Sequence, residues 1–411
     1  MIREISRRKC LRLWLCKPEY MERTKWENRF VLLRFWKKNY MMFLKDLKRF
    51  KMERLYDKLK AYSESDFYAF HMPGHKRNKT LLGIELPYDL DITEIDGFDD
   101  LHHADGILKE EQERAARVFG AEESHFLVNG STAGILSAVM GCTHRGDKIL
   151  VARHCHKSIY HAIYMNGLVP RYVYPEFDIS MHMNGEISKE DVAKALAAEP
   201  DIKAVVIVSP NYDGVVSDVK GIAEVAHSYR IPLIVDEAHG PHFGFHPAFP
   251  GRANDLGADV VINSLHKTLP SLTQTAILHI NGKLANRRRI KKYLDMLQSS
   301  SPSYIFMASL DACVDFVDGK CEEAFELYVE RLQKSREELK PLQHLQILRT
   351  EHYDISKVVI STANANITSP ELADRLRKEY HLEMEMTGGT YVLAMTTVAD
   401  TQEGLDRLKS A

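Results

Sequence analysis

Short apolar segments alternate with amphipathic segments through the middle of the chain, and this alternation constrains the fold more than any other feature. The apolar segments, which we predict to be strands, are residues 125–128, 148–151, 204–208, 232–235 and 258–263. Helices are predicted between them near residues 135–140, 158–165, 189–198 and 219–229. Uniformly apolar strands joined by helices are typical of a parallel sheet covered on both faces. The pattern therefore predicts an α/β fold, a mostly parallel sheet flanked by helices, with a ligand crevice at the carboxyl ends of its strands.

The character of the sequence changes beyond about residue 282. Predicted helices near 287–293, 322–339 and 370–380 are combined there with short apolar strands at 357–361 and 390–394. This mixture predicts a smaller α+β lobe. We therefore divide the chain into a leader of residues 1–51, an N-terminal segment 52–90, a large domain 91–281 and a small C-terminal domain 282–411.

Residues 1–51 differ in composition from the rest of the chain. They contain 16 Lys and Arg against 5 Asp and Glu, together with all three tryptophans, Trp14, Trp26 and Trp36. The chain totals are 55 and 57, so the remaining residues carry 39 basic and 52 acidic side chains, a balance of −13. A basic arm for nucleic acid or an anionic membrane surface is one interpretation of the leader. A non-native upstream start or a disordered segment is the other, which we favour, and we expect neither nucleic acid nor membrane as a partner.

Cysteine spacing and hydropathy indicate the cellular environment. The six cysteines show neither a CxxC pair nor a regular spacing, so they predict neither a zinc site nor a disulfide framework. They are Cys10, Cys16, Cys142, Cys155, Cys313 and Cys321. No apolar run reaches the roughly 18 residues expected of a membrane span. These features favour a protein of the reducing cytoplasm that binds no metal.

A lysine follows the apolar segment 258–263, in the stretch 264–268 that reads Ser-Leu-His-Lys-Thr. At the exit of a buried strand, the amine of Lys267 can be partly desolvated and so become available as a neutral nucleophile. Ser264 and His266 can donate hydrogen bonds to phosphate oxygens beside it. A reactive lysine next to a phosphate site suits pyridoxal phosphate (PLP), whose aldehyde a lysine binds covalently. The alternative is a solvated loop lysine.

Two further strand ends carry groups that suit the same cofactor. Ser131 and Thr132 lie between a predicted strand and a helix, where hydroxyl and backbone N–H groups can hold a phosphate. A simple helix cap is the alternative for them. Asp236 ends the apolar segment 232–235, and a carboxylate buried there needs a cationic partner, which a protonated pyridine nitrogen would supply.

Three other side chains are candidates for contacts with the cofactor ring. His239 and Asn211 follow strand ends, and each could reach the phenolic oxygen of the ring. A structural hydrogen bond would explain His239 as well, and an Asx turn would explain Asn211. His156 follows the strand 148–151 and could stack on the ring, but chemistry alone does not separate it from the neighbouring His154.

An acidic segment precedes the first predicted strand of the sheet. Residues 91–103 contain five acids, among them Glu94, Asp96, Asp99 and Asp100, without helical or strand periodicity. Like-charged carboxylates in one loop repel one another unless a cation lies between them. The segment therefore either caps a helix or faces a cationic ligand, such as a substrate with a long cationic side chain.

In combination, these motifs resemble one family closely. They are Phe-His-Met-Pro-Gly-His-Lys (70–76), Asp-Asp-Leu-His-His (99–103), Asn-Gly-Ser-Thr (129–132), His-Lys-Ser (156–158), Asp-Glu-Ala-His-Gly (236–240), Ser-Leu-His-Lys-Thr (264–268) and Gln-Ser-Ser-Ser-Pro-Ser-Tyr (298–304). From about Met52 onward the chain resembles the bacterial Orn/Lys/Arg decarboxylases, which are PLP-dependent enzymes of fold type I. We expect this chain to lack the C-terminal tail that is usual in the family.

The resemblance implies a role for each candidate residue. Lys267 would form the Schiff base with PLP, Asp236 would pair with the pyridinium nitrogen, and His156 rather than His154 would stack on the ring. It further implies a homodimer or higher homo-oligomer with shared active sites. The phosphate contacts that it implies come from Ser131, Thr132, Ser264 and His266, and from Ser300 of the neighbouring subunit.

The resemblance also implies the reaction, which is decarboxylation of arginine, lysine or ornithine to its amine and CO2 in polyamine metabolism, with arginine as our first choice. An aminotransferase or lyase of the same fold would share the cofactor residues. Such an enzyme would normally show an arginine for the substrate carboxylate, and Arg375 and Arg377 lie on a predicted helix without special context. A third alternative is an inactive, truncated paralogue that acts as a binding subunit, against which intact Lys267, Asp236 and His156 argue.

Overall fold

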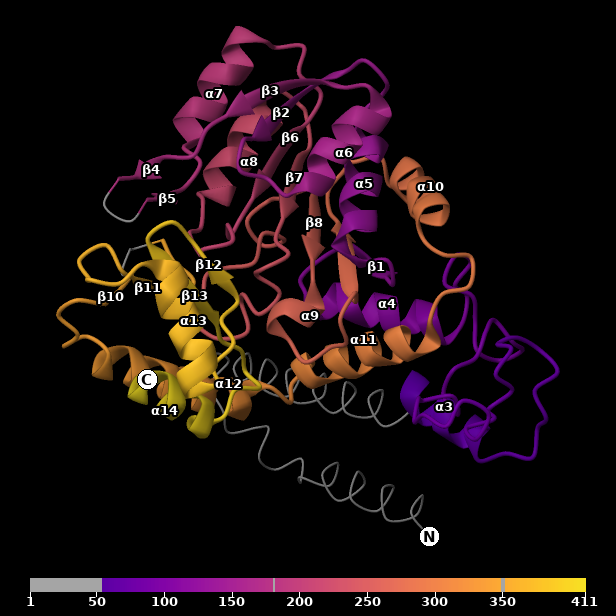
Figure 1. Ribbon diagram of the computed structural model, residues 1–411. Coiled ribbons are helices and arrows are strands. Elements are labelled where there is room, and N and C mark those ends of the chain that lie inside the picture. The colour runs from indigo at the N-terminus through magenta and orange to yellow at the C-terminus, as the bar shows by residue number, and fades with distance from the viewer. Residues whose placement is uncertain (1–53, 180–181, 349–351) are drawn as a thin grey trace, which may run out of the picture. The chain divides into compact units, whose positions relative to one another are not determined.

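A seven-stranded sheet lies between residues 123 and 280. Figure 1 shows the computed structural model, which describes residues 54–179, 182–348 and 352–411. The strand order is β1-β9-β8-β7-β6-β2-β3. The bounds are β1 (Glu123–Leu127), β2 (Lys148–Ala152), β3 (Val169–Val173), β6 (Val205–Val208), β7 (Leu233–Asp236), β8 (Val260–Asn263) and β9 (Ala276–Ile280). Four of the six pairings are parallel, and β9 runs antiparallel to both β1 and β8.

Helices cover both faces of this sheet. α5 (Gly130–Cys142) and α6 (Lys157–Asn166) lie on one face, and α7 (Lys189–Ala198) and α8 (Val219–Ser228) lie on the other (Figure 1). Every residue of the central strands β6, β7 and β8 is buried, because helices pack on both sides of them. The predicted fold class, a mostly parallel sheet flanked by helices, is confirmed.

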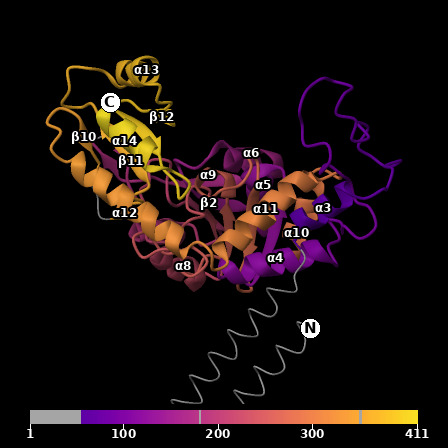
Figure 2. The same cartoon turned by 90° about the horizontal axis from the view of Figure 1, so that it is seen from below.

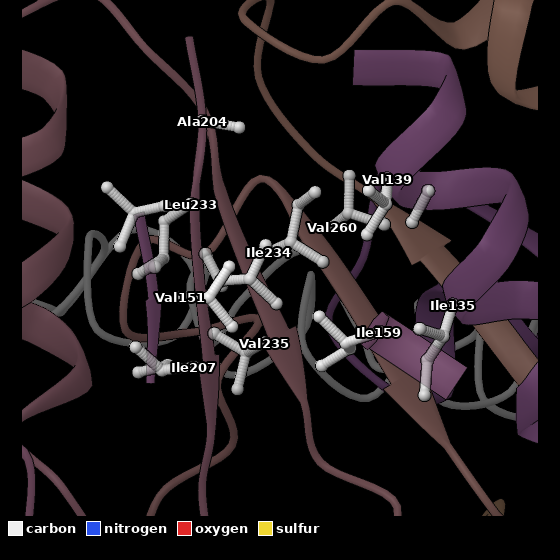
Figure 3. Close-up of a cluster of buried hydrophobic side chains, with 14 of the residues drawn as sticks. Ile135, Val139, Val151, Ile159, Ala204, Ile207, Leu233, Ile234, Val235 and Val260 are labelled. Carbon is white, nitrogen blue, oxygen red and sulfur yellow. The ribbon is translucent and has the colours of Figure 1, made fainter. Parts of the chain in front are cut away.

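Branched aliphatic side chains fill the space between the sheet and the helices. Figure 3 shows Val235 and Val260 of the sheet in one cluster with Ile135 of α5 and Ile159 of α6. Burial of each such side chain contributes about 1.5–3 kcal/mol. The uniformly apolar strands that the sequence shows are therefore the centre of the core.

The parallel register brings the carboxyl ends of the central strands together. Val208 of β6 lies beside Asp236 of β7, and Asp236 lies beside Ile262 of β8. The short helix α9 (Leu265–Thr268) begins just after β8. Polar residues that follow these strands therefore lie at one edge of the sheet.

A second, antiparallel sheet lies in the C-terminal part, with the order β10-β11-β13-β12. Its strands are β10 (Gln346–Ile347), β11 (Lys357–Ser361), β12 (Met386–Thr387) and β13 (Tyr391–Met395), and the helices beside it are α12 (Glu322–Glu338), α13 (Ser369–Tyr380) and α14 (Gln402–Ser410). A capping box of Thr368 and Glu371 begins α13. α10 (Arg287–Leu297) packs along α5. The small C-terminal domain of residues 282–411 stays a prediction.

Three more helices pack together and share a buried charge network. They are α3 (Leu55–Ser63), α4 (Ile107–Val118) and α11 (Tyr304–Val317). Arg114 forms ion pairs with Glu111, Asp311 and Asp315, while Asp311 also accepts a hydrogen bond of 3.0 Å from the backbone N–H of Leu55. Burial, together with Asp311, raises the pKa of Glu111 to about 9, so this carboxyl group is protonated at neutral pH. Asp315 also pairs with Arg54 and Lys320, so the network joins three helices without a surplus of negative charge.

Several elements are not revealed by the sequence patterns. α11 is buried on most of its positions, so it lacks the amphipathic period that marks a helix. The edge strand β3 contains Pro170 and exposed residues, which weakens its strand pattern. β4 (Phe177–Asp178) and β5 (Met183–Asn184) form a small separate hairpin.

The leader of residues 1–51, with both interpretations of its basic composition, lies outside the described residues. So do Cys10 and Cys16, while the other four cysteines are free. Within the part of the chain that the structure describes, no helix is long and apolar enough to cross a membrane.

Because α5 and α10 lie close together at Gly141, we predict that alanine at this position destabilises the fold. A Cβ atom on Gly141 would lie 2.8 Å from Cα and 2.9 Å from the backbone nitrogen of Ile290. Gly141→Ala should therefore lower the free energy of unfolding by about 1–3 kcal/mol, because backbone cannot move as a side chain can. In α14 a Cβ on Gly404 would have Thr401 Oγ1 at 3.9 Å, so Gly404→Ala should stabilise by up to about 1 kcal/mol.

Denaturant unfolding of both variants checks this prediction. Equal or opposite effects at the two positions would contradict the packing of α10 against α5.

Candidate active site

Lys267 lies in α9, directly after the buried strand β8. Its Nζ is 2.9 Å from Nε2 of His239, which follows β7. Burial lowers the pKa of Lys267, while the nearby carboxylates of Asp236 and Glu385 act in the opposite direction. The amine is thus more easily deprotonated than that of a solvated lysine, as a nucleophile requires.

Asp236 is the last residue of β7 and is only 3% exposed. Its Oδ1 accepts a hydrogen bond of 3.1 Å from the backbone N–H of Ala238, whereas Oδ2 has no hydrogen-bond partner among the described residues. Burial raises the pKa of Asp236 to about 6, against the effects of Lys267 and of the Ala238 N–H group. A cationic ligand atom beside Oδ2 would stabilise the ionised form.

His239 connects the lysine with the interior of the site. Burial, and next the cationic Lys357 and Lys267, lower the pKa of His239 well below its usual value, so the ring is neutral. Its Nδ1 is buried without a partner in the described chain. The ring of Tyr212 lies against it, with 4.7 Å between the centroids. A neutral imidazole with one uncommitted nitrogen can bond both the amine and a ligand.

The two predicted phosphate loops meet in space. Ser131 Oγ, at the start of α5, forms a short hydrogen bond with Ser264 Oγ, at the end of β8. Asn129, the N-cap residue, does not cap α5 with its side chain, so the first backbone N–H groups of this helix are left for another acceptor. Thr132 is exposed beside Ser131, and His266 Nδ1 bonds the carbonyl of Thr275 at 2.7 Å. The arrangement suits an anion at the helix N-terminus.

His156 and His154 occupy different environments. His156 is the N-cap residue of α6, and its Nδ1 contacts the Ser158 hydroxyl at 2.8 Å, which leaves the ring exposed and oriented. Burial, and next the cationic Lys267, lower the pKa of His156. His154 is half-buried, its Nδ1 has no partner in the described part of the chain, and burial lowers its pKa to about 4. These contacts favour His156 as the ring that faces a ligand near Lys267.

Comparison with known proteins identifies the family. Residues 53–365 match the sequence model described as Orn/Lys/Arg decarboxylase, major domain. The chain belongs to the Orn/Lys/Arg decarboxylase family. The arginine decarboxylase of Bacillus subtilis (strain 168) is 34% identical over 372 residues, which are 87% of this chain and 76% of that protein.

Lysine decarboxylases are further relatives. LdcA of Pseudomonas aeruginosa is 29% identical over 286 residues, 61% of this chain and 38% of that protein. The solved constitutive lysine decarboxylase of Escherichia coli has a TM-score of 0.76 at 21% identity and shares the fold over 93% of this chain. The present chain spans 62% of the length of that structure. These relatives support decarboxylation of a basic amino acid as the reaction class.

The contacts of two candidate residues do not place them beside Lys267. Asn211 Oδ1 accepts hydrogen bonds from the backbone N–H groups of Asp213, Gly214 and Val215, as the Asx-turn alternative predicts. Ser300 is exposed in a loop whose Ser299 N–H bonds Asn129 of the same chain at 3.0 Å. The contact of Ser300 with a neighbouring subunit stays a prediction.

Part of the acidic segment 91–103 stabilises the local fold. Asp99 Oδ2 accepts hydrogen bonds from the backbone N–H groups of Gly106 and Leu108, at 2.9 and 3.0 Å, and so holds the start of α4. Asp100 Oδ1 bonds the N–H of His102 at 2.9 Å. For Asp99 these contacts favour the helix-capping alternative over the ligand-facing one, because its carboxylate accepts hydrogen bonds from helix N–H groups.

Glu385 is a functional candidate that the sequence did not reveal. It precedes β12, is exposed, and accepts a short hydrogen bond from the hydroxyl of Tyr212, whose ring lies against His239. Its charge acts on the pKa of Lys267 although 118 positions separate the two in the sequence. Because only tertiary structure brings this acid to the lysine, no motif or spacing could have indicated it.

We predict that Lys267→Ala abolishes covalent attachment of PLP without unfolding the chain, because the burial of β8 and not the lysine holds α9. Borohydride reduction after incubation with PLP, followed by peptide mapping, measures the attachment, and thermal unfolding measures the fold. Lys283→Ala, at an exposed lysine after β9, is the control and should keep the label on Lys267. Recovery of the cofactor on another lysine of the wild type would refute the assignment.

Proposed function

We propose that this chain is a PLP-dependent decarboxylase that converts a basic amino acid to its amine and CO2. The observation that carries the proposal is the pairing of Lys267 Nζ with His239 at 2.9 Å in a site that also holds the buried, incompletely bonded carboxylate of Asp236. Family membership supports the reaction class. Decarboxylation within polyamine metabolism is part of the proposal.

The residues present fit PLP. The Oδ2 atom of the buried Asp236 has no hydrogen-bond donor among the described residues, and the start of α5 offers free N–H groups beside two hydroxyls. When bound, the cofactor supplies an electron sink for the pair left by departing CO2. In our proposal Lys267 binds the aldehyde, Asp236 holds the proton of the ring nitrogen, and His156 packs on the ring. The phosphate would be held by Ser131, Thr132, Ser264 and His266.

The protein groups have distinct tasks in this proposal. His239 holds the amine of Lys267 in place and keeps it within reach of the reacting atoms. The interior position of Asp236 excludes water from the ring nitrogen, which strengthens the ion pair. Lys267, once the substrate amine has displaced it, would take up the proton of the substrate's ammonium group and donate it to the carbon that CO2 leaves.

An aminotransferase or lyase would share these residues, but the structure offers less support for it. Arg375 Nε bonds Glu379 at 3.1 Å and Arg377 pairs with Asp374 at 3.4 Å, both on the exposed surface of α13. Both arginines thus lie on the surface of α13 with acidic neighbours of the same helix, and no contact connects them with Lys267 among the described residues. The alternative of an inactive binding subunit is disfavoured because Lys267, Asp236 and His156 are all present and grouped.

Glu385 is the acid that we propose for the cationic end of the substrate. Its carboxylate is exposed and linked through Tyr212 to His239, the residue whose ring lies against the amine of Lys267. A long cationic side chain needs such a counter-charge, and the acids of residues 94–100 are partly used by α4. Arginine is our first choice of substrate because the arginine decarboxylase of Bacillus subtilis is similar over 87% of this chain.

Exposed apolar side chains support the proposed homodimer. The loop between α3 and α4 projects away from the helices in Figure 2. His75 stacks on Tyr88 with 4.4 Å between centroids and pairs with Asp91 at 3.2 Å, so the loop is held by its own contacts. Its exposed large apolar side chains are Phe67, Tyr68, Phe70, Met72, Leu81, Leu82, Ile84 and Leu86. Such a surface is typical of a protein interface, and we propose a second copy of this chain as the partner.

The test of the proposed function supplies PLP and, separately, arginine, lysine, ornithine and leucine, and measures CO2 together with the amine. We expect agmatine from arginine, or cadaverine or putrescine from the other two, and no product from leucine. Formation of a keto acid without CO2 would overturn the proposal in favour of an aminotransferase.

We also predict that Glu385→Gln lowers kcat/KM for the basic substrate by tenfold or more, which is about 1.4 kcal/mol. The reason is the loss of a charge-assisted contact to the cationic side chain. Glu383→Gln, at an exposed acid two positions earlier, is the matched control and should leave kcat/KM within about twofold. Equal losses in both variants would show that the effect is not specific to Glu385.

A further inference from the structure

The helix that carries Lys267, α9, is a single turn of four residues. The backbone N–H of Lys267 bonds the carbonyl of Ser264 at 3.1 Å. The N–H of Leu269 bonds the carbonyl of Leu265 at 2.9 Å. A turn this short is not stable by itself, because the nucleation of a helix is unfavourable. The direction of the Lys267 side chain therefore depends on the contacts that α9 makes with its surroundings.

Polar side chains at three positions connect this turn with other elements. Ser264 Oγ bonds Ser131 Oγ, and His266 Nδ1 lies 2.7 Å from a backbone carbonyl oxygen of the following loop. Thr268 Oγ1 lies 3.0 Å from Nδ1 of His242. Ser264 and His266 belong to the proposed phosphate site, so the cofactor would share their polar atoms. Thr268 is not among the proposed cofactor contacts, and its bond to His242 stays free of that competition.

The ring of His242 is buried and is held on its other side by the buried Asp354. Nε2 of the ring lies 3.1 Å from Asp354 Oδ1. Burial alone would raise the pKa of Asp354, but His242, Lys357 and Ser356 outweigh it and hold the pKa at about 2. An ionised carboxylate only accepts hydrogen bonds, so Nε2 carries a proton and donates it. In the neutral ring, Nδ1 then accepts the hydroxyl proton of Thr268.

Asp354 is itself fixed in the turn before β11. Its Oδ1 accepts the backbone N–H of Ser356 at 3.0 Å, and its Oδ2 accepts the Ser356 hydroxyl at 2.8 Å. Its own N–H donates to the carbonyl of Gly214 at 2.8 Å. Breaking any of these buried bonds leaves a polar group without its partner. A continuous line of hydrogen bonds thus runs from the turn before β11 to the residue after Lys267.

We propose that His242 is a positioning residue for Lys267, which acts through Thr268 and fixes the orientation of α9. In this orientation Nζ of Lys267 lies 2.9 Å from Nε2 of His239. A reactive amine must be held in a narrow range of directions, because a small misplacement slows its reaction greatly. The inference rests on the proposed function of Lys267.

The alternative is that apolar packing alone orients α9. Leu265 is wholly buried and Leu269 is 4% exposed, so both anchor the turn in the core. Burial of apolar surface is non-directional, and it resists withdrawal of the turn more than rotation about its axis. A hydrogen bond depends on angle as well as distance, so the bond from Thr268 to His242 supplies the directional restraint.

The test measures how fast the full chain, freed of cofactor, captures PLP on Lys267, followed by visible absorbance and borohydride trapping. Thr268→Val keeps the side-chain shape but removes the hydroxyl, and it should slow capture by roughly tenfold or more. Deoxypyridoxine phosphate has a methyl group in place of the aldehyde and probes the cofactor site without the lysine. Its dissociation constant should stay within about twofold of the wild-type value.

Three further variants sharpen the test. Thr268→Ser restores a hydroxyl and should restore rapid capture. His242→Gln keeps an amide group near Asp354 but loses the Nδ1 atom, so it should slow capture as Thr268→Val does. Combining the two slow variants should add no further loss, because both remove the same bond. Thr273→Val, at an exposed threonine of the loop after α9, is the matched control and should capture PLP at the wild-type rate.

The outcomes distinguish this inference from the proposed function. If Thr268→Val captures PLP on Lys267 as fast as the wild type, the positioning role is refuted and the proposed function stands. If Thr268→Val weakens binding of deoxypyridoxine phosphate as much as it slows capture, the site has loosened in general and the inference is also wrong.

Loss of folding is decided in the same way. If Thr268→Val does not fold, His242→Gln takes its place in the same measurements, and if neither folds, the bond is needed for the structure and the inference is refuted. If PLP is trapped on another lysine of the wild type, the proposed function falls, and the inference falls with it.

Discussion

The burial of Asp236 is the constraint on which the rest of the site depends. A carboxylate at the end of a central strand is almost wholly shielded from water, and this burial raises its pKa to about 6 although Lys267 lies near enough to oppose the shift. One backbone N–H group is its hydrogen-bond donor within the described chain. The fold therefore maintains a site for a cation at this point, and the other candidate groups surround it because β6, β7 and β8 end at the same edge of the sheet.

The two sheets are coupled at the position of the reactive lysine. The backbone N–H of Asp354, before β11, donates to the carbonyl of Gly214 at 2.8 Å, and the carboxylate of Asp354 holds His242, which contacts Thr268 in α9. A movement of the smaller sheet would therefore be transmitted to α9 through buried hydrogen bonds. Such bonds are costly to break, since each leaves a polar group without a partner in a dry interior. The orientation of Lys267 thus depends on residues from both parts of the chain.

The parts of the molecule that the sequence predicts are those governed by local patterns. Continuous apolar runs locate β6, β7 and β8, and a residue at the end of such a run, such as Asp236 or Lys267, is recognisable without tertiary information. The antiparallel direction of β9 cannot be recognised in the sequence, because the direction of a strand leaves no trace in its periodicity. Asp99 holds N–H groups seven and nine residues away, beyond the span of any capping motif, and Glu385 approaches Lys267 through folding alone.

Two buried cations show how differently the fold treats charge. The guanidinium of Arg114 is surrounded by Glu111, Asp311 and Asp315, so the charge between α4 and α11 is neutralised locally. Lys357 is buried as deeply, yet its ammonium group has no hydrogen bond in the described chain. Full neutralisation is what a charge retained for stability requires, because an unpaired ion in the interior is destabilising. The carboxylate of Asp354, with Oδ2 at 3.9 Å from Lys357 Nζ, therefore compensates this buried charge without a hydrogen bond.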